Sequence, residues 1–444
     1  MRMGPNPAPR LVIISAAAAV ILCAKLYLIA LLGSDTPFWD QWEAEGARLY
    51  VPYFAGTLSI EHWFAVHNEH RILFTRILAM ASLLAGGDWS PVRQTIINAT
   101  LHVFALFMIV VWLSRGLGLM TTIVLSAIVA TMFSVPFAWM NTVIGFQSQF
   151  YFLVLFGCSS SYLIGRHEAW SPLWWLGALF GIASYLSLSS GALTLLAAAL
   201  ISGLQLGLAQ REGAREYAAI AFLVAACAVM TLDVINATPA GSSLHPSPSQ
   251  FSAAIIRILS WPVPVQGVLK QTIAASAIYA PAALALLTVI RRRAPLSDPI
   301  WTCLAFAAWV TLQAGAIAFG RPNAPIQPHY LDIYLIGLLA NAACLLHLAT
   351  NSAHRVRATL AAASWTGVVL YYGAHVALNN LPSEIETRRA TARAQAENLS
   401  RFLATGDPSH LRNKPVFEIP YPDAERLREI ATDPAIRAIL RNGS

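Results

Sequence analysis

Residues 34–87 read SDTPFWDQWEAEGARLYVPYFAGTLSIEHWFAVHNEHRILFTRILAMASLLAGG and form the longest polar interruption between the apolar segments of the chain. The stretch gathers acids, imidazoles and guanidinium groups among many aromatic rings, in a sequence that otherwise contains few charges. Such a concentration needs a reason, and we expect the remaining segments to be organised around it.

The composition defines the class of protein. Hydrophobic residues make up 57% of the 444 residues, charged residues only 11%, and the mean hydropathy is +0.57. A soluble domain of this size could not carry that surface without exposing much of it to water, so we predict an all-α membrane protein with many spans. The net charge is +7, and the basic residues of membrane proteins usually lie in cytoplasmic loops, so nucleic-acid binding is not expected. The five cysteines lie in apolar segments without CxxC spacing, so no disulfide framework or metal knuckle is indicated.

The first apolar run, residues 11–33, follows a short basic start at residues 1–10. It is long enough to cross about 30 Å of hydrocarbon, and the alternative, a cleaved signal peptide, has a poor cleavage site at Leu32-Gly33-Ser34. Residues 72–86 are short for a span and contain Arg76, so we interpret them as a helix at the interface. Ten further apolar runs bring the prediction to about eleven transmembrane helices: 95–114, 117–135, 150–165, 172–188, 191–209, 217–235, 272–290, 300–320, 330–349 and 359–377.

The short loops support this count by their charge. With the N-terminus inside, every predicted cytoplasmic loop carries basic residues, as the positive-inside rule requires. These residues are Arg115, Arg166, His167, Arg211, Arg215, Arg291, Arg292, Arg293, His354, Arg355 and Arg357. The loop 34–87 and the C-terminal tail then both lie outside. We divide the chain into a transmembrane domain, residues 1–380, and a small extracytoplasmic tail, residues 381–444.

Two acids at the start of the outer loop are candidate catalytic groups. Asp40 follows the first span closely, where an unpaired carboxylate is costly unless it faces water or a cation. If residues 40–47 continue as a helix, Asp40 and Glu43 share one face by their i, i+3 spacing. The alternative is a solvated loop acid, and the neighbouring aromatic residues equally suit an interfacial belt.

The motif HNEHR, residues 67–71, is a candidate ligand-binding segment. On a helix His67, His70 and Arg71 would share a face, which suits a phosphate contact by Arg71 with imidazole donors beside it. The two histidines could instead share a metal ion with Glu69 or Asp40, or belong to a solvated loop.

Further polar residues lie near the predicted outer ends of later spans. Arg321 suits a lipid phosphate, because guanidinium groups bind phosphate oxygens in a fork, or it extends to the interface only to reach water. His329 and Tyr330 lie at the start of the next span. Gln147, in GFQSQF, is a further binding candidate or plain helix-end polarity.

The first span leads into an acidic outer loop with short amphipathic helices, the chain has about eleven predicted spans, and an outer arginine lies near a late span. In these features the chain resembles the GT-C superfamily of membrane glycosyltransferases. The resemblance covers the architecture of residues 1–380. It implies a polyprenyl-phosphate-linked sugar donor, with Asp40 as the base and Glu43 or Asp35 as substitutes. Arg321, or else Arg71, would hold the lipid phosphate. Where the superfamily often has adjacent acids, this chain has Asp40-Gln41.

The resemblance further implies an inverting transfer to a glycan or lipid acceptor of the cell envelope, in a bacterial inner membrane, with the N-terminus cytoplasmic and the C-terminus extracytoplasmic. Such a reaction needs a carboxylate to activate the hydroxyl and cations to hold the leaving phosphate. No resident metal site is predicted, and the sequence leaves open whether Mg²⁺ or Mn²⁺ helps to bind the phosphate. The alternatives are a secondary transporter or lipid-carrier flippase, and a nonenzymatic partner of another envelope enzyme.

Overall fold

The computed structural model describes residues 8–238 and 246–440, so most of the basic start lies outside the described residues. In these ranges seven helical segments are long and apolar enough to cross a membrane. They are α1 (Ala8–Leu32), α5 (Pro91–Leu113), η3 with α10 (Ser189–Leu193 and Thr194–Gly207), α11 (Ala214–Ala237), α13 (Val268–Arg292), α14 (Ile300–Gly320) and η4 with α15 (Pro328–Tyr330 and Leu331–Thr350). The predicted all-α membrane character is therefore supported, whereas the count of eleven spans stays a prediction.

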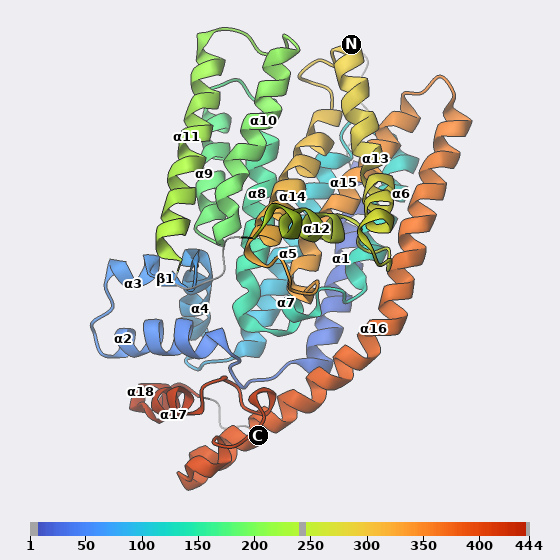
Figure 1. Cartoon of the computed structure of the whole chain (residues 1–444). Coiled ribbons are helices and arrows are strands. Elements are labelled where there is room, and N and C mark those ends of the chain that lie inside the picture. The colour runs from blue at the N-terminus through green and yellow to red at the C-terminus, as the bar shows by residue number, and fades with distance from the viewer. Residues whose placement is uncertain (1–7, 239–245, 441–444) are drawn as a thin grey trace.

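Four more helices run beside these seven (Figure 1). Their lengths or compositions differ from those of the seven: α6 (Leu119–Ser134) and α9 (Pro172–Tyr185) are shorter, α8 (Ser148–Arg166) is rich in serine, and α16 (Arg355–Thr405) has a polar second half. The helix α16 is continuous over 51 residues, and the predicted domain boundary at residue 380 lies inside it.

Three helices begin with the same Ser-Pro pair. The hydroxyls of Ser90, Ser171 and Ser247 accept hydrogen bonds from the backbone N–H groups at the starts of α5, α9 and α12 (Pro248–Leu259). The proline that follows each serine occupies the first helical position, where its missing N–H costs nothing. Local sequence therefore fixes where these helices begin.

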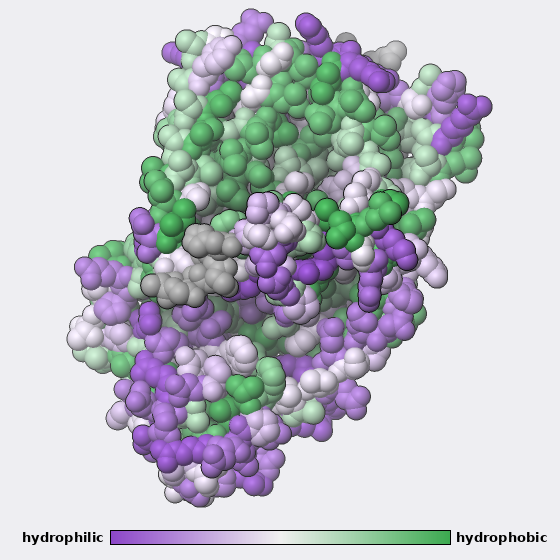
Figure 2. Space-filling view, in the orientation of Figure 1, coloured by the Kyte–Doolittle hydropathy of each residue, from purple (hydrophilic) through white to green (hydrophobic). Residues whose placement is uncertain are grey.

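One end of the helical body, which we call the polar end, carries most of the hydrophilic surface. It is the lower end in Figure 1, and in Figure 2 it is mainly purple below a largely green upper half. Two segments build it, residues 34–90 and residues 380–440. The first contains η1 (Gln41–Tyr50), α2 (Val51–Phe54), α3 (Ile60–Phe64), β1 (Val66–His67), β2 (His70–Arg71) and α4 (Leu73–Gly86). The second contains the end of α16, η5 (Pro408–His410), η6 (Val416–Glu418), α17 (Ala424–Thr432) and α18 (Pro434–Ile439).

The C-terminal segment is packed onto the first of these segments. Trp42, Tyr50 and Trp89 form a buried cluster with Leu427, Ile430 and other apolar residues of the tail. The backbone N–H of Trp89 donates to the carbonyl of Ile439 at 2.8 Å. The two ends of the polar sequence thus share one small core, separate from the large core among the long helices.

Candidate functional site

A cleft of about 830 Å³ opens at the polar end, where α8, α14 and α15 have their nearest ends. Its wall brings together residues that are far apart in the sequence: the start of η1, the β1–β2 hairpin, α7 (Trp139–Val143) with η2 (Gly145–Gln147), the loop after α14, and the polar half of α16. Seven of the predicted site residues line it: Asp40, His67, His70, Gln147, Arg321, His329 and Tyr330. Glu43 and Arg71 do not.

Asp40 is the predicted catalytic acid that lines the cleft. Its side chain is 43% exposed, and one carboxylate oxygen lies 3.2 Å from Nε2 of the buried His67. The ring of His67 packs edge-on against Phe146, which limits its rotation. A water-accessible carboxylate beside an imidazole is suited to accept a proton from a hydroxyl group.

The helix predicted from Asp40 onward exists, but it has π geometry over Gln41–Tyr50. Because a π-helix bonds residue i to i+5, its wider turn rotates residue i+3 away from residue i, so the spacing argument for a shared face fails. Glu43 instead bonds Arg48 and Arg426, each at 2.9 Å. Burial alone would raise the pKa of Glu43, but the hydrogen bonds from the two arginines lower it overall. Glu43 thus anchors the tail and has no place in the cleft.

Residues 67–71 form a β-hairpin and not the helix on which the predicted shared face of His67, His70 and Arg71 depended. Asn68 has a φ of +52° in the two-residue turn, which an asparagine adopts more easily than most residues. The register pairs His67 directly with His70, so the hairpin still brings the two imidazoles together. Arg71 does not line the cleft. Its guanidinium group donates hydrogen bonds to both carboxylate oxygens of Asp233 at 2.7 Å.

A chain of polar contacts leads from the hairpin to Arg321. His70 contacts the hydroxyl of Ser189 through Nδ1 at 2.8 Å, and its Nε2 lies 3.7 Å from Glu69. Glu69 in turn pairs with Arg321 at 3.3 Å. Burial lowers the pKa of His70 to about 4, so at neutral pH its ring is uncharged and acts only through hydrogen bonds. The positive charge of this part of the cleft is carried by Arg321, whose side chain is 52% exposed.

The floor of the cleft is aromatic and amide-rich. His329 and Tyr330 pack against Phe150, and the amide of Asn141 donates to the His329 carbonyl at 2.9 Å. Within the described residues, some buried polar atoms of this floor have no hydrogen-bond partner, including Nδ1 of His329 and Oε1 of Gln147. Such atoms are rare in folded proteins and are suited to a polar ligand.

Trp39 forms a wall next to Asp40. Its φ of +49° is uncommon for a bulky residue, and its ring stacks on Phe417 of the tail at 6.0 Å with an interplanar angle of 11°. The backbone N–H of Trp39 donates to Pro420 at 2.7 Å. The tail therefore fixes the strained residue that precedes the exposed acid, a role that the sequence did not reveal.

The sequence analysis also missed the wall formed by α16. Glu384 accepts a hydrogen bond from Trp139 at 2.7 Å, and Arg388 lies over the ring of Phe38 at 4.7 Å. Both line the cleft. In sequence these residues belong to an ordinary charged helix, and only the path of α16 across the polar end brings them to the cleft (Figure 1).

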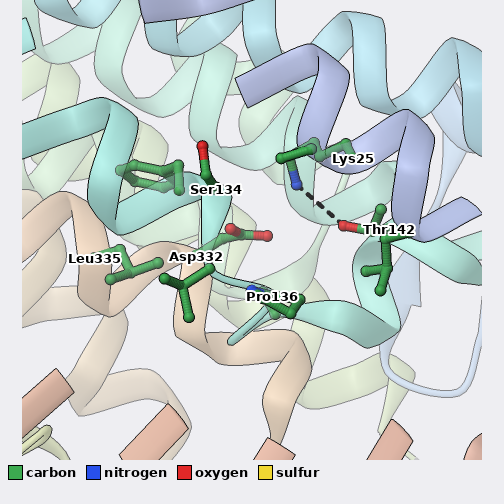
Figure 3. Close-up of a pocket in the computed structure, with 11 residues that line it drawn as sticks. Lys25, Ser134, Pro136, Thr142, Asp332 and Leu335 are labelled. Atoms are coloured by element: carbon green, nitrogen blue, oxygen red, sulfur yellow. Dashed lines mark hydrogen bonds between the residues drawn. The ribbon is translucent and has the colours of Figure 1, made fainter. Parts of the chain in front are cut away.

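A second polar cluster lies among the long helices, below the cleft floor. The ammonium group of Lys25 donates to Thr142 at 3.0 Å, and Asp332 accepts from Asn141 at 2.9 Å. Figure 3 shows Lys25, Thr142 and Asp332 around one small space, a cavity of about 10 Å³. Lys25 and Asp332 are 6% and 2% exposed. This cluster could have been suspected from the sequence, because Lys25 is a charged residue inside the first apolar span, but it was not predicted.

Within the described residues, no three His, Cys, Asp or Glu side chains converge to hold a metal ion, so the alternative in which His67 and His70 share one has no matching geometry here. Comparison with known proteins adds no identity, because no family model, no curated protein and no solved structure matches this sequence. The assignment of function therefore rests on the cleft itself.

Proposed function

We propose that this protein is a membrane glycosyltransferase with a GT-C-like architecture. It moves a sugar from a polyprenyl-phosphate-linked donor to a glycan or lipid acceptor of the envelope, with inversion. The observation that carries the proposal is that Asp40 and Arg321, 281 positions apart, line one cleft beside the apolar helices. A base for the acceptor hydroxyl and a cation for the leaving phosphate are the two groups that such a transfer requires.

Each of the seven predicted site residues that line the cleft has a role in this reaction. Asp40 takes the proton of the acceptor hydroxyl, and the imidazole of His67 lies 3.2 Å from its carboxylate. Arg321 binds the phosphate in exchange for its contact with Glu69, since that contact is solvent-exposed and weak. Gln147, His329, Tyr330 and His70 contact the sugar through hydrogen bonds and ring faces. The phosphate is already a good leaving group, so the reaction needs no strong general acid.

The proposal includes a membrane topology. The chain crosses a bacterial inner membrane eleven times, the seven spans above together with α6, α8, α9 and the first half of α16. The N-terminus is cytoplasmic and the polar end, with the tail, extracytoplasmic. Supporting this orientation, the basic loops with Arg115, Arg166 and Arg291–Arg293 connect helices at the end opposite the cleft.

Sugar transfer in membranes tests the proposal. With a panel of hexose and pentose donors on polyprenyl phosphate, we expect Asp40→Asn to lower turnover by about 10²–10⁴-fold, the usual contribution of a general base. Glu61→Gln is the matched control, because Glu61 is an exposed acid of the same loop outside the cleft. Arg321→Ala should raise the KM for the donor. Full turnover in Asp40→Asn at normal expression would refute the role of the acid.

One observation favours a second function, a secondary transporter or lipid-carrier flippase. Lys25 and Asp332, both buried among the long helices, lie close to His102, whose Nε2 is 3.8 Å from Asp332. Ionisable groups in such positions are common in ion and proton pathways. Uptake of a polyprenyl-linked sugar into proteoliposomes, without any transfer and abolished by Asp332→Asn, would support this function over the transferase.

A further inference from the structure

Arg388 is a buried cation without a counter-ion. Its side chain comes from the polar half of α16, is 5% exposed and lines the cleft. It forms no ion pair with any residue in the ranges 8–238 and 246–440. Its Nε has no hydrogen-bond partner there, and Nη1 reaches only Gln395 at 3.3 Å. A buried guanidinium that is neither paired nor fully hydrogen-bonded is costly unless a ligand completes it.

The acid one helical turn before Arg388 does not provide the missing charge. Glu384 lies one turn before Arg388, the spacing at which ion pairs form on helices. Its carboxylate instead accepts a hydrogen bond from the indole N–H of Trp139 at 2.7 Å. Under Arg388 lies the ring of Phe38, 4.7 Å away, which supports the cation without neutralising it.

Arg388 also stands apart from the charged groups around Asp40. Asp40, His70, Arg321 and His329 influence one another electrostatically, whereas burial is the one influence on Arg388 and lowers its pKa to about 10. At neutral pH the guanidinium is still charged. The cleft therefore contains two separate positive centres, one at Arg321 and one at Arg388.

We propose that Arg388 marks a second subsite, which binds an oxyanion of the acceptor, either a phosphate ester or a sugar carboxylate. The inference rests on the proposed function in assigning Arg321 to the donor phosphate, because that leaves Arg388 for the other substrate. A planar guanidinium binds both kinds of oxyanion through paired N–H donors. Thr387 and Thr391, which line the same wall, supply hydrogen bonds to the neighbouring hydroxyls.

Equilibrium binding to the full chain in detergent tests the subsite without requiring turnover. The probes are glucose 6-phosphate, glucuronate and glucose, so the two acids distinguish the two sources of oxyanion. We expect at least one acid to bind about tenfold or more tightly than glucose, and Arg388→Gln to remove this preference. Arg388→Lys should keep part of it, because it keeps the charge. The matched control is Arg389→Gln, which changes the adjacent, exposed arginine outside the cleft.

Two results would overturn the subsite: a wild-type protein that binds neither acid better than glucose, or an unchanged preference in a folded Arg388→Gln variant. The first result comes from the wild-type protein alone, so it can overturn the proposal even if Arg388→Gln does not fold. Transfer assays separate this inference from the proposed function. Anion preference that depends on Arg388 without any sugar transfer would refute the transferase alone. Transfer in Arg388→Gln with an unchanged KM for the acceptor would refute the subsite alone.

Discussion

Replacing Glu45 by glutamine should make the protein more stable at alkaline pH. Glu45 is 1% exposed, and its Oε2 accepts hydrogen bonds from Gln41, Trp89 and Gln94, while its Oε1 has no hydrogen-bond partner among the residues that the structure describes. Burial raises the pKa of Glu45 to about 7, against 4.5 for an ordinary glutamate. The folded protein therefore keeps this proton up to a pH at which the unfolded chain has lost it.

The sign and size of the effect follow from proton linkage. Between pH 4.5 and about 7 unfolding releases the Glu45 proton, so the free energy of unfolding falls as the pH rises and is lowest above pH 7. One pKa unit corresponds to 1.36 kcal/mol, and the difference of about 2.5 units therefore costs about 3 kcal/mol. Glutamine resembles the protonated carboxyl, with its oxygen accepting the three hydrogen bonds, and escapes this cost.

Thermal unfolding of the purified protein in detergent, measured from pH 5 to pH 8, provides the assay. We expect Glu45→Gln and the wild type to unfold at similar temperatures at pH 5, and the variant at a clearly higher temperature at pH 8. Glu61→Gln removes an exposed charge from the same loop and should follow the wild type throughout. Parallel curves for the wild type and Glu45→Gln would show that the buried carboxyl carries no such penalty, and the reasoning would be wrong.

Two further predictions concern the packing of η1. Gly46→Ala should destabilise the protein by about 1–3 kcal/mol, because a Cβ there would lie 3.0 Å from the indole of Trp89; Gly203→Ala, with open space around it, should leave the unfolding temperature unchanged or slightly higher. Arg426→Ala removes the ion pair with Glu43 of η1 and should lower the free energy that holds the tail on the body by about 0.5–1 kcal/mol. Limited proteolysis after residue 405 should then be a few times faster. Arg428 pairs with Glu425 of the tail itself, so Arg428→Ala should be cut at the wild-type rate.

Sequence reasoning brought Asp40 and Arg321 to one end of the molecule because the parity of the apolar segments constrains both loops. The start of α9 at Pro172 agrees with the predicted run 172–188, whereas α5 begins at Pro91, four residues before the predicted run 95–114. Local geometry was less accessible. The π-helix after Asp40 packs against α4 and α17, and the hairpin at residues 67–71 contacts Phe146 and Ser189, and periodicity carries no trace of those contacts. Arg388 was missed because Phe38, the ring beneath it, lies on a distant segment whose placement against α16 only the folded chain defines.

The cleft wall combines residues from both ends of the polar sequence, among them Trp39 near the beginning and Phe417 near the close. A ribosome makes Phe417 only after all the long apolar helices have been made. The cleft wall is thus incomplete until then. A chain terminated before residue 384 would contain the residues of the helical body but lack the Arg388 side of the wall, and with it the proposed acceptor subsite.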